Sequence, residues 1–155
     1  MINKNSYNVL LVDDDLHQVD LARRAVADCC PEINLTAVGG GEAALEWFNA
    51  CIEQKGQVPH ILLLDLKLPK LDGLAVLRSL RLNDVTRDIP IVVFSAEYTQ
   101  EDVLMSYQVG ANSFVPKPVD LVQFGEFLRE RLAYWKHPLQ RELAFAVKGG
   151  TTETI

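Results

Sequence analysis

Residues Ile61–Gly73 read Ile-Leu-Leu-Leu-Asp-Leu-Lys-Leu-Pro-Lys-Leu-Asp-Gly, and this stretch decides the fold. Its four leading branched apolar residues favour a strand that is covered on both faces, as a central strand of a parallel sheet is. Asp65 follows this strand directly, at the carboxyl edge where open α/β sheets bind their ligands. The Leu-Pro-Lys-Leu-Asp-Gly segment predicts a tight loop that feeds a helix. Taken alone, Asp65 is equally suited to accepting hydrogen bonds from loop amides, so the rest of the chain must decide its role.

Two other apolar runs repeat this pattern of a buried strand that ends in polar side chains. Val9–Val12 is followed by the acidic run Asp13–Asp15, and Ile91–Phe94 is followed by Ser95. Two weaker segments complete the predicted strands: Asn34–Val38 and Ser113–Val115. Pro116 has no backbone N–H to donate to a neighbouring strand, so we expect the last strand at an edge of the sheet.

Helical periodicity fills the intervals between the predicted strands. Apolar residues recur every three or four positions in four segments, which span about 16–29, 42–54, 73–83 and 121–135. A further helix is expected between Thr99 and Gly110. Asp72 and Asp120 stand where helix N-caps are expected, and Thr99 with Asp102 resembles a capping box. Because strands and helices alternate five times, the sequence predicts a doubly wound α/β fold with a parallel five-stranded sheet covered by helices on both faces.

Composition indicates one ordinary globular domain with a short extension. The chain has 155 residues, of which 48% are hydrophobic and 23% are charged. A net charge of −6 argues against a nucleic-acid or anionic-membrane surface, since either needs clustered lysine and arginine, so protein partners are expected. We also find no signal-peptide run and no apolar stretch near the roughly 20 residues that span a bilayer, which favours a cytoplasmic protein.

The cysteines and histidines suggest neither a metal site nor a catalytic triad. The three cysteines lack metal-ligand and redox spacing, so reduced thiols are expected at Cys29, Cys30 and Cys51. The histidines are widely separated along the chain, which favours surface or loop positions for His17, His60 and His137.

The predicted sheet brings five polar side chains to its carboxyl edge: Asp13, Asp14, Asp65, Ser95 and Lys117. Three carboxylates in one pocket repel each other unless a cation lies between them, and all-oxygen ligands suit Mg²⁺. An aspartate beside Mg²⁺ can attack phosphorus to give an aspartyl-phosphate, while a lysine and a hydroxyl meet the phosphoryl oxygens. Each residue alone has an ordinary explanation as a solvated acid, turn residue or surface lysine, so the hypothesis depends on their convergence.

The order of these motifs resembles the receiver domain of two-component response regulators, over about Val9–Trp135. The segments that carry the resemblance are Val12–Asp14, Asp65–Gly73, Ser95–Ala96 and Gly110–Pro118. The resemblance implies the flavodoxin-like (βα)5 fold with strand order 2-1-3-4-5. It also implies a signalling phosphoacceptor rather than an enzyme, with chemistry limited to its own phosphorylation and dephosphorylation.

Position by position, the resemblance implies that Asp65 is the phosphoacceptor. Asp13 and Asp14 would hold Mg²⁺ together with Asp65 and the backbone carbonyl of Lys67. Ser95 would supply the switch hydroxyl and Lys117 the phosphate-sensing ammonium. The family also implies a cis peptide bond between Lys117 and Pro118.

Phe114 stands where this family places its switch aromatic, which is often tyrosine. Without a hydroxyl the ring has less reason to remain in water, so we expect an inward rotamer that follows Ser95 toward a phosphate. The alternative is that Phe114 is only core of an edge strand. Lys67 and Glu97 flank the expected site, at positions that influence phosphoryl lifetime in this family.

We expect a receiver domain over residues 1–137 and a C-terminal extension over 138–155, and hence a stand-alone regulator. The end of the last helix and the tail are apolar, at Tyr134, Trp135, Leu139, Leu143, Phe145 and Val147. These residues suggest a homodimer through the fourth helix, fifth strand and fifth helix, although the tail is equally suited to packing on its own domain. The chain also looks similar to single-domain regulators that are paired with phytochrome-type histidine kinases, so a sensor histidine kinase is the expected partner.

Two other classes of protein fit the residues less well. A phosphatase with an aspartate nucleophile needs a second acid two residues later, where this chain has Lys67. A flavin carrier needs a hydroxyl- and amide-rich phosphate loop after the first strand, where this chain has Asp13–Asp15. A receiver that acts without phosphorylation remains an open alternative.

Overall fold

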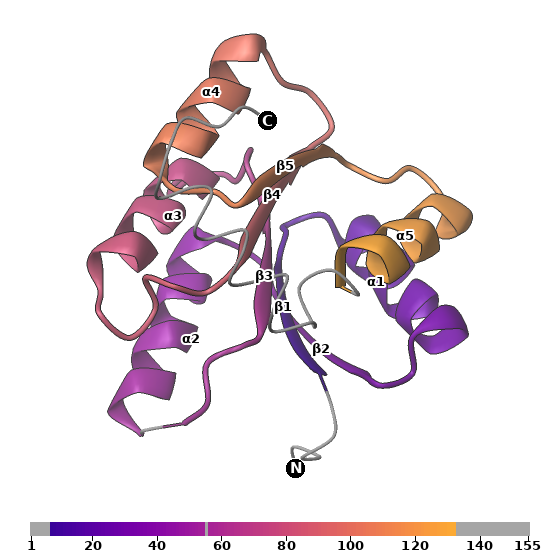
Figure 1. Cartoon of the computed structure of the whole chain (residues 1–155), viewed down its shortest axis with the longest axis horizontal. Helices are drawn as coiled ribbons and strands as arrows, with labels where there is room; N and C mark the ends of the chain where they lie inside the picture. Colours follow the sequence, from indigo (N-terminus) through magenta and orange to yellow (C-terminus); the bar gives the residue numbers. More distant parts are fainter. Residues whose placement is uncertain (1–6, 55, 133–155) are drawn as a thin grey trace.

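The computed structural model describes residues 7–54 and 56–132, and it confirms the predicted alternation of strands and helices (Figure 1). The elements are β1 (Tyr7–Val12), α1 (Leu16–Cys29), β2 (Ile33–Val38), α2 (Gly41–Glu53), β3 (Ile61–Asp65), α3 (Gly73–Leu82), β4 (Ile91–Ser95), α4 (Gln100–Val109), β5 (Ser113–Pro116) and α5 (Leu121–Phe127), which continues into a π-helical turn at Leu128–Leu132.

The five strands form one parallel sheet in the order β2-β1-β3-β4-β5, as predicted. β5 lies at an edge, which agrees with the position of Pro116. The register pairs Val12 with Leu64 and Asp65 with Phe94, so the carboxyl ends of β1, β3 and β4 are nearly level. Side chains that follow these strands are therefore brought to one edge of the sheet.

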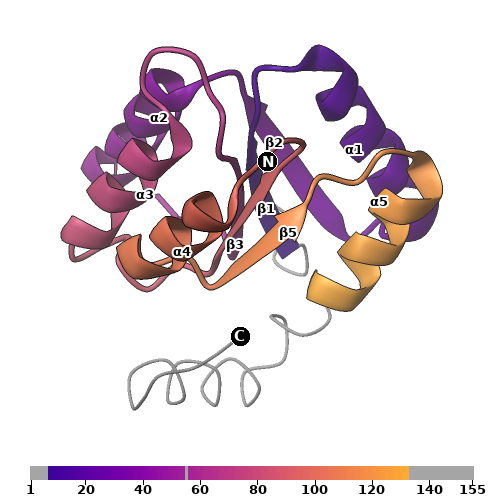
Figure 2. The same ribbon diagram turned by 90° about the horizontal axis from the view of Figure 1, so that it is seen from above.

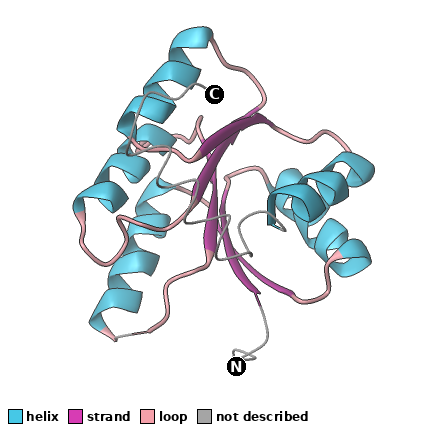
Figure 3. Ribbon diagram, in the orientation of Figure 1, coloured by secondary structure: helices cyan, strands magenta, loops and turns pink. Residues whose placement is uncertain are grey.

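Helices cover both faces of the sheet. Figures 1 and 2 show α1 and α5 on one face and α2, α3 and α4 on the other, and Figure 3 shows the same three layers by secondary structure. Alternate residues of β1 serve the two cores: Val9 and Leu11 pack in the cluster with α1 and α5, whereas Leu10 and Val12 pack in the opposite cluster. β3 and β4 are buried along their whole length, as their uninterrupted apolar runs predict.

Three predicted helix caps are present at the carboxyl edge of the sheet. The Asp72 carboxylate accepts from the Ala75 amide at 3.0 Å, and Asp120 caps α5 in the same way. At the start of α4, Thr99 and Asp102 form the reciprocal capping box. Because such caps each contribute about 1 kcal/mol, they fix where the loops of this edge end.

Two details differ from the sequence prediction. Leu16 was expected on the buried face of the first helix but is 82% exposed, because Asp15 is the N-cap and Leu16 lies in the first turn, beyond the core. The last helix is regular only to Phe127 before its π-helical turn. The proposed end of the receiver domain at 137, together with His137 and the apolar tail from Tyr134 to Val147, lies outside the described residues.

The sequence did not indicate a half-buried arginine that joins three segments at the opposite end of the sheet. Arg81 of α3 donates to the carbonyls of Arg87 and Ile89 before β4, and to Gly110 O after α4. Its Nη2 also donates to Asn112 Oδ1 at 2.8 Å. Burial lowers the pKa of Arg81 to about 10, which still leaves it charged at neutral pH.

The cysteines carry free thiols, and one histidine has a structural role. Cys30 is buried, and burial together with the neighbouring Cys29 raises the pKa of its thiol to about 12. His60 is half-buried, its Nδ1 accepts from the Asn8 amide at 2.9 Å, and its ring stacks on Tyr7. No helix within residues 7–54 and 56–132 has both the length and the apolar character to cross a bilayer.

Candidate functional site

Asp65 is the last residue of β3 and is only 3% exposed. Its Oδ1 accepts a hydrogen bond from the backbone N–H of Lys67 at 3.1 Å. Its Oδ2 accepts from Lys117 Nζ at 3.2 Å, from the loop that follows β5. The carboxylate is therefore held at both oxygens, by a loop amide and by an ammonium group 52 residues away in the sequence.

Asp13 lies beside Asp65 and shares the same ammonium group. It is buried after β1, and its Oδ1 accepts from the Asp15 amide at 2.9 Å. Its Oδ2 lies 2.9 Å from Lys117 Nζ as an ion pair, but it accepts no hydrogen bond of good geometry among the described residues. A buried carboxylate oxygen in this situation retains capacity for a further cation.

The third acid, Asp14, completes an acidic cluster that is open to solvent on one side. One carboxylate oxygen from each of Asp13, Asp14 and Asp65 lies within 4.8 Å of the others, and Asp14 is exposed. Three carboxylates against one ammonium group leave an excess of negative charge. Close oxygen donors with such a charge fit a hard divalent cation that keeps some of its waters, as Mg²⁺ does. The three predicted carboxylate ligands are thus brought together. The N–H of Lys67 donates to Asp65, while the predicted role of its carbonyl stays a prediction.

Burial and the neighbouring charges act in opposite directions on the pKa values of Asp65 and Lys117. Burial raises the pKa of Asp65 to about 6, the Lys117 ammonium acts to lower it, and the Asp13 charge raises it. For Lys117, burial acts to lower the pKa, but Asp13 and Asp65 outweigh this effect and raise it. Lys117 is therefore a stable cation in the site, while Asp65 is ionised at neutral pH at a cost in free energy.

Ser95 ends β4 and is almost fully buried. Its hydroxyl donates to the carbonyl of Glu97 at 2.8 Å, within the β4–α4 loop. Tyr98 in this loop packs edge-to-face on Phe114 of β5, with ring centroids 4.9 Å apart. Phe114 is half-buried against the core on the α2–α4 side. The predicted switch hydroxyl and aromatic ring are thus linked through one loop.

The predicted cis peptide bond between Lys117 and Pro118 was wrong. The described residues contain no cis peptide bond, so this one is trans. The trans form of a bond before proline is favoured by about 0.5–1 kcal/mol. With the trans bond, Lys117 Nζ still contacts both Asp13 and Asp65. Pro118 is buried, and its carbonyl accepts from Gln18 Nε2 at 3.1 Å.

Two features of the site were not identified as such from the sequence. Gly73 packs directly on the backbone of β3: a Cβ there would lie 2.8 Å from Leu66 Cα and would collide with the carbonyl of Asp65. The side chain of Lys67 forms an ion pair with Asp102 of α4 at 3.2 Å. The glycine after the Asp72 cap was a visible signal, whereas an ion pair between residues far apart in the sequence leaves no local pattern.

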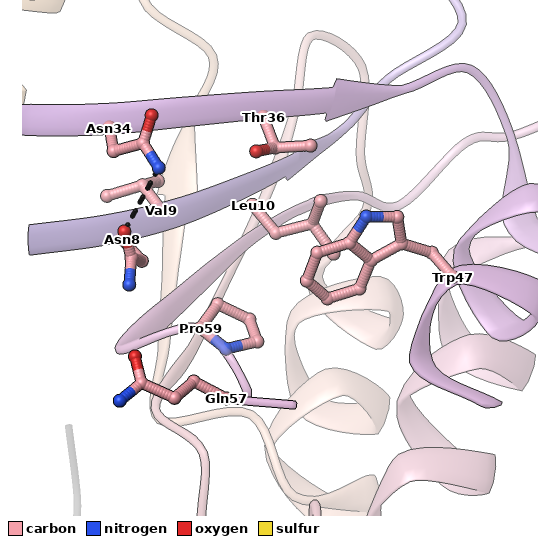
Figure 4. A pocket seen from close by; sticks show the side chains of 8 residues that line it. All are labelled: Asn8, Val9, Leu10, Asn34, Thr36, Trp47, Gln57 and Pro59. Carbon is pink, nitrogen blue, oxygen red and sulfur yellow. Dashed lines mark hydrogen bonds between the residues drawn. The ribbon is translucent and has the colours of Figure 1, made fainter. Parts of the chain in front are cut away.

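A small cavity of about 50 Å³ lies elsewhere in the molecule (Figure 4). It is bordered by β1, β2, α2 and the segment before β3, and Trp47 forms one wall. Asn34 donates to Asn8 at 3.1 Å at its border. None of the acidic cluster, Ser95 or Lys117 lines it, so this cavity is separate from the candidate site.

Comparison with known proteins identifies the family. A model of the response regulator receiver domain matches residues 9–129. The chain belongs to this family. The matched span contains every predicted site residue and runs from β1 to the end of α5.

Among curated proteins, the response regulator Rcp1 of Synechocystis sp. is 28% identical over 132 residues, which cover 82% of this chain and 87% of Rcp1. Among solved structures, the phosphorylated cyanobacterial phytochrome response regulator RcpA is 26% identical with a TM-score of 0.75, covering 84% of this chain and 94% of RcpA. The bacteriophytochrome response regulator AtBRR is 33% identical with a TM-score of 0.67, covering 84% and 95%. Such regulators share the flavodoxin-like receiver fold with this chain.

Proposed function

We propose that this chain is a single-domain response regulator that accepts a phosphoryl group on Asp65 from a sensor histidine kinase, with the help of Mg²⁺. One observation carries the proposal: the buried Asp65 carboxylate lies at the carboxyl edge beside the Asp13 carboxylate, and the Lys117 ammonium contacts both. That arrangement combines a nucleophile, a cation site and a group that binds phosphoryl oxygens.

In the proposed reaction an Asp65 oxygen attacks the phosphorus of a phosphohistidine. An O–P bond forms, the N–P bond breaks, and its electron pair stays on the departing imidazole. Lys117 exchanges its contact with Asp65 for one with a phosphoryl oxygen, and the Ser95 hydroxyl exchanges the Glu97 carbonyl for another. Mg²⁺ bound by Asp13, Asp14, Asp65 and the Lys67 carbonyl would neutralise charge on the transferred group.

The proposed output is a change of surface near α4 and β5. If Ser95 leaves Glu97, the loop that carries Tyr98 must adjust, and Phe114 packs on that ring. Leu104 of α4 is 61% exposed on this side of the molecule, which favours a contact with a partner or with a second copy of the chain. We propose a homodimer through α4, β5 and α5, to which the extension at 138–155 contributes.

Exposed apolar side chains beside the site offer a surface for the kinase. Leu16 begins α1, while Val119 and Val122 lie in and after the β5–α5 loop, and all three are largely exposed. The hydrogen bond from Gln18 to the Pro118 carbonyl joins these two segments. Since RcpA is a phytochrome response regulator, we propose a histidine kinase of phytochrome type as the partner. We also propose that this chain is cytoplasmic and contacts neither nucleic acid nor membrane.

The test is intact-mass spectrometry after incubation with acetyl phosphate, with and without Mg²⁺. We expect a gain of about one phosphoryl mass that requires Mg²⁺ and is absent from Asp65→Asn. Asp72→Asn is the matched control, because an asparagine at this position can still cap α3 and the adduct should form normally. An adduct that persists in Asp65→Asn, or none in the unaltered chain with Mg²⁺ bound, would contradict the proposal and favour an interaction module that is independent of phosphorylation.

A further inference from the structure

The ion pair between Lys67 and Asp102 connects the candidate site to α4. Lys67 lies two residues after Asp65, and its backbone N–H donates to the Asp65 carboxylate. Its side chain extends to Asp102 in the first turn of α4, where Nζ lies 3.2 Å from Oδ2. The same residue thus contacts the proposed phosphoacceptor through its backbone and a helix of the proposed output surface through its side chain.

The Asp102 carboxylate also belongs to the capping box of α4. Its Oδ2 accepts from the Thr99 amide at 2.9 Å, while its own amide donates to Thr99 Oγ1 at 3.1 Å. The hydrogen bond from Thr99 and the Lys67 ammonium keep the pKa of Asp102 below its usual range. One oxygen atom therefore joins the loop after β3 to the residue that starts α4.

The two side chains differ in their freedom to move. The Lys67 side chain is 55% exposed, whereas the Asp102 side chain is 22% exposed and accepts a hydrogen bond from the Thr99 amide. The Asp102 backbone amide is held as well, by Thr99 Oγ1. Ion pairs at such exposure are weak, and a new anion within reach of Lys67 can compete with Asp102. A phosphoryl group adds about 1.5 to 2 negative charges and three acceptor oxygens, and here it would be attached two residues from Lys67.

We propose that Lys67 and Asp102 form an ionic latch that holds the start of α4 against the β3–α3 loop, and that phosphorylation of Asp65 opens it. In the resting chain the Lys67 ammonium pairs with Asp102 Oδ2, the same oxygen that accepts from Thr99 in the α4 capping box. In the phosphorylated chain its ammonium group turns toward the phosphoryl oxygens, and Asp102 keeps only its bonds with Thr99. The opening of the latch rests on the proposed phosphorylation of Asp65, whereas the resting latch does not.

The experiment follows the carboxyl carbon resonance of Asp102 by NMR, in the full chain and before and after incubation with acetyl phosphate and Mg²⁺. Lys67→Met removes the ammonium group and keeps the backbone of the site. We expect this substitution to shift the Asp102 resonance, and phosphorylation of the unaltered chain to shift it in the same direction. Exchange of the Thr99 and Asp102 amides should become about two- to five-fold faster in both cases, in keeping with a weak ion pair.

Arg24→Met is the matched control, because Arg24 forms a similarly close ion pair with Asp20 at 3.0 Å on α1. It should leave the Asp102 resonance and both amides unchanged. An unshifted Asp102 resonance in Lys67→Met would overturn the resting latch, whether or not the chain accepts phosphate. If mass spectrometry shows the phosphoryl adduct but the resonance does not move, the switching step fails and the proposed function stands. If no adduct forms, the proposed function and the switching step both fail.

Discussion

Lys117 Nζ lies 3.2 Å from Asp65 Oδ2, so the proposed phosphoacceptor is paired with a cation before any phosphoryl group arrives. The same nitrogen lies 2.9 Å from Asp13 Oδ2, and the Lys117 side chain is largely buried. One ammonium group therefore neutralises part of the charge of two buried carboxylates. This arrangement leads to two predictions on the stability of the protein.

The first prediction concerns Lys117→Met. The substitution leaves two buried carboxylates without their cation, and breaking a buried ion pair by removing one partner costs about 3–5 kcal/mol. We expect a loss of this size in the free energy of unfolding, measured by urea denaturation at neutral pH without Mg²⁺. Saturating Mg²⁺ should recover part of it, because the cation would take over the screening of Asp13 and Asp65. A loss that Mg²⁺ does not change would argue against a cation site here.

The second prediction concerns Asp65→Asn and pH. The pKa of Asp65 is about 6 in the folded chain and about 3.9 when unfolded, so between these values the folded state binds more protons. Ionisation of Asp65 therefore lowers the free energy of unfolding as pH rises from about 4 to 6, and the loss reaches its full size above pH 6. Without Mg²⁺, Asp65→Asn should raise the free energy of unfolding by about 3 kcal/mol at pH 7.5.

That gain should vanish below about pH 4, where both states carry a protonated Asp65. Urea denaturation at the two pH values measures it. Asp72→Asn serves as control, since it makes the same change of side chain at an exposed position outside the acidic cluster. A variant Asp65→Asn that is less stable than the unaltered chain at pH 7.5 would contradict this description of the site.

The third prediction concerns Gly73→Ala. Its new Cβ would lie 2.8 Å from Leu66 Cα and against the Asp65 carbonyl, so the backbone of β3 or the start of α3 must shift. Overpacking of this kind costs about 1–3 kcal/mol, and the shift should also slow phosphorylation by acetyl phosphate. Thermal denaturation and intact-mass time courses measure the two effects. Gly39→Ala is the matched control, because nothing lies within 4 Å of a Cβ at that position.

The fourth prediction concerns Arg81→Met. This change removes the Arg81 donor from the carbonyls of Arg87, Ile89 and Gly110. Asn112 Oδ1 also loses a bond but still accepts from the Ile91 amide. Buried acceptors without partners cost about 1–3 kcal/mol each when water cannot reach them, so we expect a loss of at least about 3 kcal/mol. Arg78→Met, on an exposed position of the same helix, should change stability by less than about 0.5 kcal/mol. Equal effects of the two substitutions in urea denaturation would refute the importance of this cluster.

The sequence predicts the features that depend on local pattern and strand position. Asp13, Asp65 and Ser95 were placed at one edge because each follows an apolar run, and parallel strands align their carboxyl ends. Contacts such as the one between Lys67 and Asp102 could not be predicted, because they depend on side-chain reach between loops that only the folded sheet brings together. The isomer before Pro118 was predicted wrongly because the two forms differ by only about 1 kcal/mol before their surroundings act.

The outer edge of β5 has a consequence for how the molecule associates. The Lys117 amide donates to the Ser95 carbonyl and so points toward β4. Because the amides of successive strand residues point to alternate sides, the Phe114 amide points away from β4, where it donates to the Tyr107 hydroxyl at 3.0 Å. Two residues later, Pro116 has no N–H to offer. A foreign strand therefore finds no donor ladder on this side, which disfavours extension of the sheet from β5 into a larger sheet or fibril. Any partner that binds here must recognise side chains, whose contacts a switch can change without unfolding a strand.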